Sequence, residues 1–139
     1  MIAGFYLISS LFPTPNFTDV HDQNTATMNV NGTTLLLGPF CGKPACQFIN
    51  VGSARGVCAG AFLQQTTMLV ANVGEYPGHI ACDGETKSEI VCPLIFRNGG
   101  DQVILGVLDL DCLVLGGFDE EDKLGLEAIA DLIVKSCDW

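Results

Sequence analysis

The chain has 139 residues, 48% of them hydrophobic, with 16 acidic against 6 basic residues and a formal net charge of −10. This length and apolar content predict one folded domain and exclude a disordered chain. The sequence has no basic stripe to neutralise phosphates, which argues against nucleic acid, and its negative charge argues against an anionic membrane surface. No run is long and apolar enough to span a bilayer, so we expect no membrane partner.

Seven cysteines are many for this length, and their odd number argues against an extracellular disulfide scaffold. The apolar N-terminus has no basic region before it and no cleavage site after it, so we predict a buried strand rather than a signal peptide. These features predict a cytoplasmic protein in which some cysteines are core residues and others are redox-active. No CxxC pair occurs, and no metal site is predicted.

The first half of the chain is rich in strand patterns. Residues 2–11 are apolar, aromatic and β-branched, which predicts a buried strand. Residues 12–32 hold two prolines and several Asn and Thr residues and predict a surface loop. Further strands are predicted at 33–40 and 44–51, the first of them as the hairpin partner of 2–11.

The second half mixes strands with a short helix. Residues 56–65 predict that helix, weakened by two glycines, and 67–73 predict a fourth strand. Residues 74–88 predict a long functional loop. Residues 89–96 and 102–111 predict a strand hairpin closed by a turn around a Gly–Gly pair.

The C-terminal segment 118–137 predicts a long helix. Asp119 is the expected N-cap, and acidic residues crowd the first turn, where the helix dipole favours them. Its apolar face is expected to comprise Leu124, Leu126, Ile129, Ala130, Leu132 and Ile133. Taken together, the predicted strands and helices indicate an α+β fold with a mostly antiparallel sheet of about six strands and two helices packed against it.

Three carboxyl groups lie where burial would give them unusual properties. In the strand VLDLD (107–111), Asp109 and Asp111 point to one side together with Val107. Two carboxylates on an apolar face need hydrogen-bond donors, protonation or a cation such as a ligand ammonium. On this motif alone, a strand end entering solvent is the simpler interpretation. Glu89, at the start of a strand, is equally expected to be exposed or to be a partly buried acid.

The cysteines divide by their surroundings. Those in or beside apolar runs are predicted to be inert core residues: Cys92, Cys112 and Cys137. Cys41 could be either an inert core residue or a reactive cysteine. Those beside turns punctuated by glycine or proline are Cys46, Cys58 and Cys82. Cys58 near a helix start, and Cys82 near His79, are best placed for a thiolate-favouring environment.

Several motifs, taken in order, resemble the free methionine-(R)-sulfoxide reductases, a family of GAF domains. They are LGPF-CGKPAC, RGVC-G-A, PGHIACD-SEIV-PL, GVLDLD and FDEED-GLE, and the similarity runs from about residue 2 to the end. The resemblance implies a GAF-like fold, with residues 1–139 as a single GAF domain that lacks the helices usually preceding the first strand. It implies thiol-dependent reduction of free methionine-R-sulfoxide, with thioredoxin as the electron source and no cofactor.

The family's three redox cysteines fall on Cys46, Cys58 and Cys82. We take Cys82 as the attacking thiolate and Cys46 as its principal resolving partner. Cys58 is then a second resolving thiol or a rival for the catalytic role. In the implied chemistry the attacking cysteine becomes a sulfenic acid, condenses with a second cysteine to a disulfide, and is restored by thioredoxin.

The family's substrate-binding carboxylates fall on Glu89, Asp109 and Asp111. Glu89 or Asp111 is the best proton donor to the departing oxygen, and the other carboxylates hold the substrate ammonium. Tyr6 matches the tyrosine of the family's substrate pocket. Family members usually carry a tryptophan four residues before it, where this chain has Ile2.

A non-catalytic GAF module that binds or senses a small ligand is the alternative function. Three redox cysteines kept together with three carboxylates favour the enzyme, because a pure binder has no need for resolving thiols. The high apolar content with low charge density is compatible with a homodimer.

Overall fold

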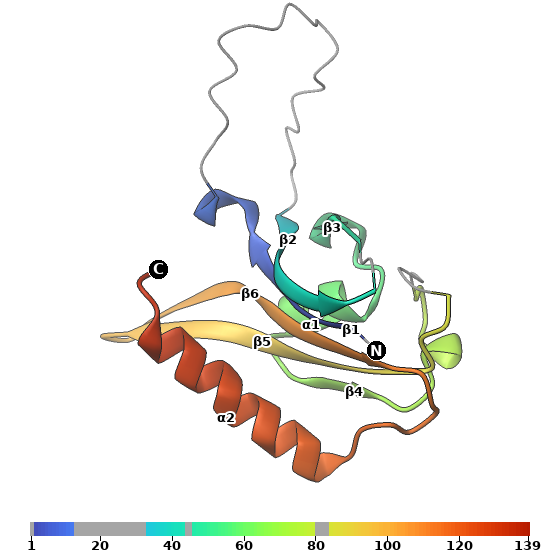
Figure 1. Cartoon of the computed structure of the whole chain (residues 1–139). Helices are drawn as coiled ribbons and strands as arrows, with labels where there is room; N and C mark the ends of the chain where they lie inside the picture. Colours follow the sequence, from blue (N-terminus) through green and yellow to red (C-terminus); the bar gives the residue numbers. More distant parts are fainter. Residues whose placement is uncertain (1, 13–32, 44–45, 80–83) are drawn as a thin grey trace, which may run out of the picture.

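The computed structural model describes residues 2–12, 33–43, 46–79 and 84–139. Within these residues, six strands form one antiparallel sheet in the order β3-β2-β1-β6-β5-β4 (Figure 1). The strands are β1 (Ile2–Ile8), β2 (Thr34–Gly42), β3 (Phe48–Asn50), β4 (Met68–Val70), β5 (Ser88–Asn98) and β6 (Asp101–Cys112). The helices are α1 (Val57–Gln64) and α2 (Glu120–Ser136), with single 3-10 turns η1 (Ser9–Leu11), η2 (Val51–Ser53) and η3 (Val73–Glu75). The predicted α+β class and antiparallel sheet are confirmed.

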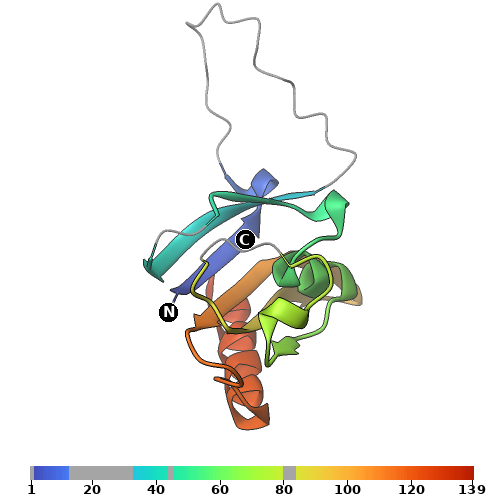
Figure 2. The same ribbon diagram turned by 90° about the vertical axis from the view of Figure 1, so that its right-hand side faces the viewer.

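The two helices cover opposite faces of the sheet, and a hydrophobic core lies under each (Figure 2). Side chains alternate along a strand, so β5 sends Ile90 and Cys92 toward α2 and Val91 toward α1. The α1 core also contains Tyr6 of β1 and Val107 of β6. The alternation therefore sends the odd-numbered residues at the start of β5 and the end of β6 to the α1 side.

The β5–β6 hairpin is longer than predicted, because its turn is tighter. Gly99 and Gly100 both have positive φ angles, +59° and +101°, which glycine adopts without steric cost. They form a two-residue turn, and Asn98 pairs with Asp101 immediately beside it. Strand 44–51, by contrast, is shorter than predicted, since within the described residues only Phe48–Asn50 pairs with β2.

The C-terminal helix begins as predicted but buries less than predicted. Asp119 accepts hydrogen bonds from the N–H groups of Glu121 and Asp122, and Asp122 accepts one from Asp119, which forms a capping box. The buried residues of α2 are Ala130 and Val134, one turn apart. The predicted apolar face is wrong for Leu124, Ile129 and Leu132, which are exposed. The apolar residues span a wider arc of the helix than its contact with the sheet covers.

The prediction that Cys92, Cys112 and Cys137 are core residues is confirmed only in part. Cys92 is buried under α2 as predicted, and Cys112 is half-buried at the end of β6. Cys137 is exposed, which contradicts the prediction, because it lies beyond the last turn of α2 at the C-cap. Cys41 is exposed as well. Among the described residues, none of the helices is long and apolar enough to cross a membrane.

Candidate active site

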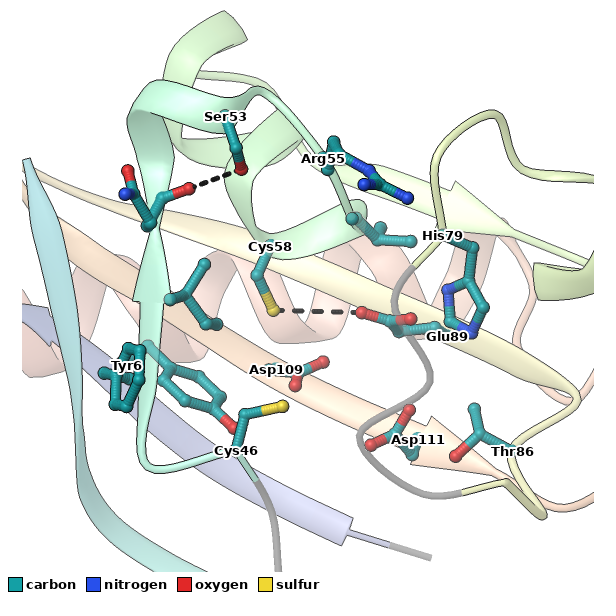
Figure 3. Close-up of a pocket in the computed structure, with 15 residues that line it drawn as sticks. Tyr6, Cys46, Ser53, Arg55, Cys58, His79, Thr86, Glu89, Asp109 and Asp111 are labelled. Carbon is teal, nitrogen blue, oxygen red and sulfur yellow. Dashed lines mark hydrogen bonds between the residues drawn. The ribbon is translucent and has the colours of Figure 1, made fainter. Parts of the chain in front are cut away.

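A cavity of about 240 Å³ lies on the α1 side of the sheet (Figure 3). Its floor is made of strand residues from β1, β5 and β6, namely Tyr6, Glu89, Asp109 and Asp111. Its roof comes from Cys46, β3, η2 and the start of α1, with His79 and Thr86 at one side. Most residues predicted for the site therefore line one cavity, although they are spread over more than 100 positions of sequence.

Strand register brings the three carboxyl groups together. Glu89 on β5 pairs with Asp111 on β6, and Asp109 pairs with Val91, two residues along. Side chains two residues apart share a face, so Glu89, Asp109 and Asp111 all point into the cavity, as Figure 3 shows. The predicted common face of Asp109 and Asp111 is confirmed.

The carboxyl groups are buried, and the simpler interpretation of a strand end entering solvent is wrong. Glu89 and Asp109 are each 6% exposed and Asp111 is 9% exposed. The end of β6 stays paired on both sides, with Ile2 on β1 and Glu89 on β5 both opposite Asp111. The cavity roof then covers the face that the carboxyl groups share.

Cys58 is the second residue of α1, and its thiol faces these acids. Its Sγ lies 3.8 Å from Oε1 of Glu89, to which the thiol donates a hydrogen bond. Ligand atoms of Cys58, Glu89 and Asp109 all lie within 4.8 Å of one another. Geometrically this group can surround a cation, either a metal ion or the ammonium of a ligand. Oδ1 of Asp109 is buried without a hydrogen-bond partner among the described residues, so it can accept a donor from such a ligand.

Burial changes the protonation of these groups. It raises the pKa of Glu89, and the charges of Asp109 and Asp111 raise it further. Burial and the charge of Asp111 raise the pKa of Asp109 to about 8. Burial also raises the pKa of Cys58, with further contributions from Asp109 and Glu89. The expected thiolate-favouring environment at Cys58 is therefore wrong, since desolvation and the nearby carboxylates favour the neutral thiol.

Two further cysteines were predicted for the site. Cys46 lies just before β3, is half-buried, lines the cavity and is disulfide-bonded. Cys82 falls outside the described residues. His79, close to it in sequence, lies at the cavity edge with its Nδ1 buried and without a hydrogen-bond partner in the described part of the chain.

Sequence reasoning missed several cavity residues of the roof and sides. They are Phe48, Asn50, Ser53, Arg55 and Thr86. The sequence GSARG indicates a turn, but a turn pattern does not show which of its side chains faces a cavity. Only the position of this turn, which ends two residues before the predicted site residue Cys58, could have drawn attention to it.

Comparison with known proteins shows the family of this chain. No family model matches the sequence. The free methionine-R-sulfoxide reductase of Saccharomyces cerevisiae is 57% identical over 104 residues, which cover 75% of this chain and 55% of the yeast protein. The structure of the same reductase (fRMsr) of Staphylococcus aureus in complex with substrate is 40% identical, with a TM-score of 0.67, over 96% of this chain and 69% of that chain. The chain belongs to the free methionine-R-sulfoxide reductase family.

The fold of the family is the predicted one. A solved GAF domain superposes on 99% of this chain and 64% of its own, with a TM-score of 0.73 and 47% identity. The GAF-like prediction is thus confirmed. The chain spans about half the length of its yeast relative, since the match covers 55% of the yeast protein.

Proposed function

We propose that the chain reduces free L-methionine (R)-S-oxide to methionine, with its own cysteines as the immediate reductant. The observation that carries this proposal is one small cavity lined by Cys46, Cys58 and three buried carboxyl groups. Thiols supply the electrons, and the carboxyl groups bind the ammonium and move protons. Membership of the family makes this reaction the natural expectation.

The carboxyl groups are the proposed binding site for the substrate ammonium. Glu89, Asp109 and Asp111 concentrate negative charge in a desolvated space, where an ammonium stabilises the ionised forms. Oδ1 of Asp109 has no partner among the described residues, which supports a ligand donor at this point.

In the proposed reaction, the thiolate of Cys82 attacks the sulfoxide sulfur. Glu89 or Asp111 donates a proton to the oxygen, which ends on the cysteine as a sulfenic acid while methionine leaves. The raised pKa of Glu89 supports it in this role, because a carboxyl that is protonated near neutral pH can donate. The sulfur of the substrate is reduced by two electrons and that of the cysteine is oxidised by two.

A second thiol then regenerates the enzyme. Cys46 condenses with the sulfenic acid of Cys82, which forms a disulfide and releases water, and reduced thioredoxin exchanges with that disulfide. The disulfide-bonded state of Cys46 supports this resolving role. The raised pKa of Cys58 favours a second resolving thiol over the attacking one, since the thiolate is the nucleophile.

Aromatic side chains are proposed to hold the methylthio end of the substrate. The residue at the position of the family tryptophan, Ile2, is buried in β1 and is not among the residues that line the cavity. Tyr6 and Phe48 both line it. Phe48 is 58% exposed, so an apolar ligand group in the cavity would cover part of its ring.

The test is NADPH oxidation coupled through thioredoxin reductase and thioredoxin, with the free R sulfoxide, the free S sulfoxide and a peptide-bound sulfoxide as substrates. We expect turnover of the free R epimer alone, loss of turnover in Cys82→Ser, and unchanged turnover in the exposed Cys41→Ser control. Wild-type protein that fails to reduce the R epimer contradicts the proposal. Full activity of Cys82→Ser would move the attacking role to Cys58.

The alternative is a GAF module that binds or senses a small ligand without turnover. Saturable binding of methionine sulfoxide in calorimetry, together with no oxidation of NADPH, would favour it.

We further propose that residues 1–139 act as a single GAF domain in the cytoplasm and pair as a homodimer. Light scattering of the protein as it elutes from a size-exclusion column tests the dimer.

A further inference from the structure

The cavity has an acidic end and a basic end. The acidic end is the carboxyl floor described above. Of the described residues that line the cavity, Arg55 is the one lysine or arginine. Figure 3 shows its side chain across the cavity from Asp109 and Asp111, beside His79. A cavity with charges of both signs suits a zwitterion.

Arg55 is held in place by the segment that carries His79. The N–H of Gly56 donates a hydrogen bond of 3.0 Å to the carbonyl of Gly78, which ties the turn before α1 to this segment. The stem of Arg55 lies against Gly78, where an added Cβ would be 3.6 Å from Cγ of Arg55. Gly78 also has a φ of +73°, which favours glycine there. The positions of Arg55 and His79 are therefore linked.

Neither residue has a partner for its polar end in the structure as described. The ion pairs found among the described residues all use lysines, Lys43, Lys123 and Lys135. Nδ1 of His79 is buried and has no hydrogen-bond partner in this part of the chain. A guanidinium offers a planar fork that matches a carboxylate, and a neutral imidazole adds one N–H donor. Together these two groups have the hydrogen-bond donors that a small carboxylate needs.

We propose that Arg55 and His79 form the subsite for the α-carboxylate of the substrate. The inference rests on the proposed function, since it assigns the second charge of the amino acid that the carboxyl floor binds by its ammonium. Binding both charges selects a free amino acid, because a methionine within a peptide lacks both of them. Arg55 is thus a specificity-determining residue, and His79 assists it.

The experiment compares methionine-R-sulfoxide with its C-terminal amide, which keeps the ammonium and the sulfoxide but lacks the carboxylate. The variants are Arg55→Gln, Arg55→Lys and His79→Gln, with Arg97→Gln as the matched control at the exposed end of β5. We expect Arg55→Gln to lower kcat/KM for the free acid by about 10- to 100-fold, the usual range for a lost hydrogen bond to a charged group, mainly through KM. The amide should lose little, Arg55→Lys should recover part of the effect, and Arg97→Gln should match wild type.

The comparison separates recognition from a structural role. An equal loss for acid and amide in Arg55→Gln, or no loss for the acid, overturns the inference. If wild type shows no turnover, the proposed function fails on its own, and calorimetric binding of methionine and methioninamide to the same variants tests the subsite. A wild-type preference for methionine that Arg55→Gln abolishes would then support it, and an unchanged preference would overturn it.

Discussion

Glu89 lies directly opposite Asp111 across the β5–β6 pair, at the floor of the cavity. Like charges opposite each other in an antiparallel pair repel, and burial removes the water that would screen them. The next acid on the same face, Asp109, adds a third carboxyl group. The ligand-free cavity therefore favours carboxyl groups that keep their protons, and a bound cation favours groups that lose them. Both stability and ligand binding should depend on pH.

The first prediction is that Asp109→Asn stabilises the ligand-free protein at alkaline pH. The pKa of Asp109 is raised to about 8 in the folded state, against an ordinary value of about 3.9. The folded protein holds this proton where the unfolded chain has released it, so the stabilising effect is complete below about pH 4 and is lost progressively up to about pH 8. Wild type should thus be less stable near pH 8 than near pH 5, and Asp109→Asn should flatten that slope by an amount on the order of a few kcal/mol.

Thermal unfolding followed by circular dichroism from about pH 5 to pH 8 measures this slope. The exposed Asp131→Asn is the control, because it removes the same charge from α2 without touching the cavity. A slope in Asp109→Asn as steep as in wild type would show that this carboxyl group titrates normally in the folded protein.

The second prediction concerns proton release on ligand binding. An ammonium placed among Glu89, Asp109 and Asp111 lowers their pKa values, since an opposite charge favours the ionised form. Binding of methionine near neutral pH should therefore release protons. Calorimetry in two buffers of different ionisation enthalpy measures the number released, and Asp109→Asn should reduce it. Proton uptake on binding would be inconsistent with an ammonium at this position.

The third prediction separates the roles of the thiols. If Cys46 and Cys58 both resolve, the double variant Cys46→Ser/Cys58→Ser should still reduce about one sulfoxide per chain and then stop, because the sulfenic acid of Cys82 finds no partner thiol. Dimedone should label Cys82 in that variant after a single exposure to substrate, and mass spectrometry locates the label. Continued thioredoxin-dependent turnover would show that neither residue is needed for recycling.

The fourth prediction is that Phe48 contributes to substrate affinity. Its ring lines the cavity and is partly exposed to solvent, so an apolar ligand group buries it further. Phe48→Ala should raise KM by about 5- to 30-fold, as expected for the loss of roughly 1–2 kcal/mol of apolar contact, with a smaller effect on kcat. Steady-state kinetics with the free sulfoxide measure both constants. The exposed Phe40→Ala is the control, and an equal effect of the two variants would mean that Phe48 has no specific contact.

Local patterns predicted part of the floor of the cavity. The alternation of side chains along a strand places Asp109 and Asp111 on one face, which follows from residues close in sequence. Glu89 was joined to them by the resemblance to the family and not by a local pattern. Burial of this face was not predictable in the same way, because the roof comes from residues 46–58, which are distant in sequence and irregular in pattern.

Two other predictions from the sequence were wrong for the same reason, because contacts with distant parts of the chain decide the outcome. The apolar residues of α2 show a helix with an apolar side, but the width of the contact is set by the sheet, which leaves Leu124 and Leu132 exposed. Cys58 lies near a helix start, which by itself favours a thiolate. The acids that reverse this effect, Glu89 and Asp109, come from strands at least 30 positions away.

The last prediction compares a glycine that is closely packed against backbone, Gly106, with a glycine that has open space beside it, Gly125. Gly106 on β6 pairs with Leu7 on β1, and an added Cβ would lie 2.0 Å from the carbonyl oxygen of Tyr6 and 2.8 Å from Cα of Leu7. Both contacts are to backbone, which cannot rotate away, so Gly106→Ala should displace β1 and cost about 3 kcal/mol or more. Gly125 in α2 has no atom within 4 Å of an added Cβ, so Gly125→Ala should stabilise the helix by roughly 0.5–1 kcal/mol.

Thermal unfolding should therefore move in opposite directions for the same chemical change. We expect Tm to fall by roughly 10 °C in Gly106→Ala and to rise by about 2–4 °C in Gly125→Ala, given a domain of this size. Because Tyr6 lines the cavity and lies on the strand that moves, Gly106→Ala should also weaken methionine binding, whereas Gly125→Ala should not. A Gly106→Ala protein with wild-type Tm would contradict the close approach of β1 and β6 at this position.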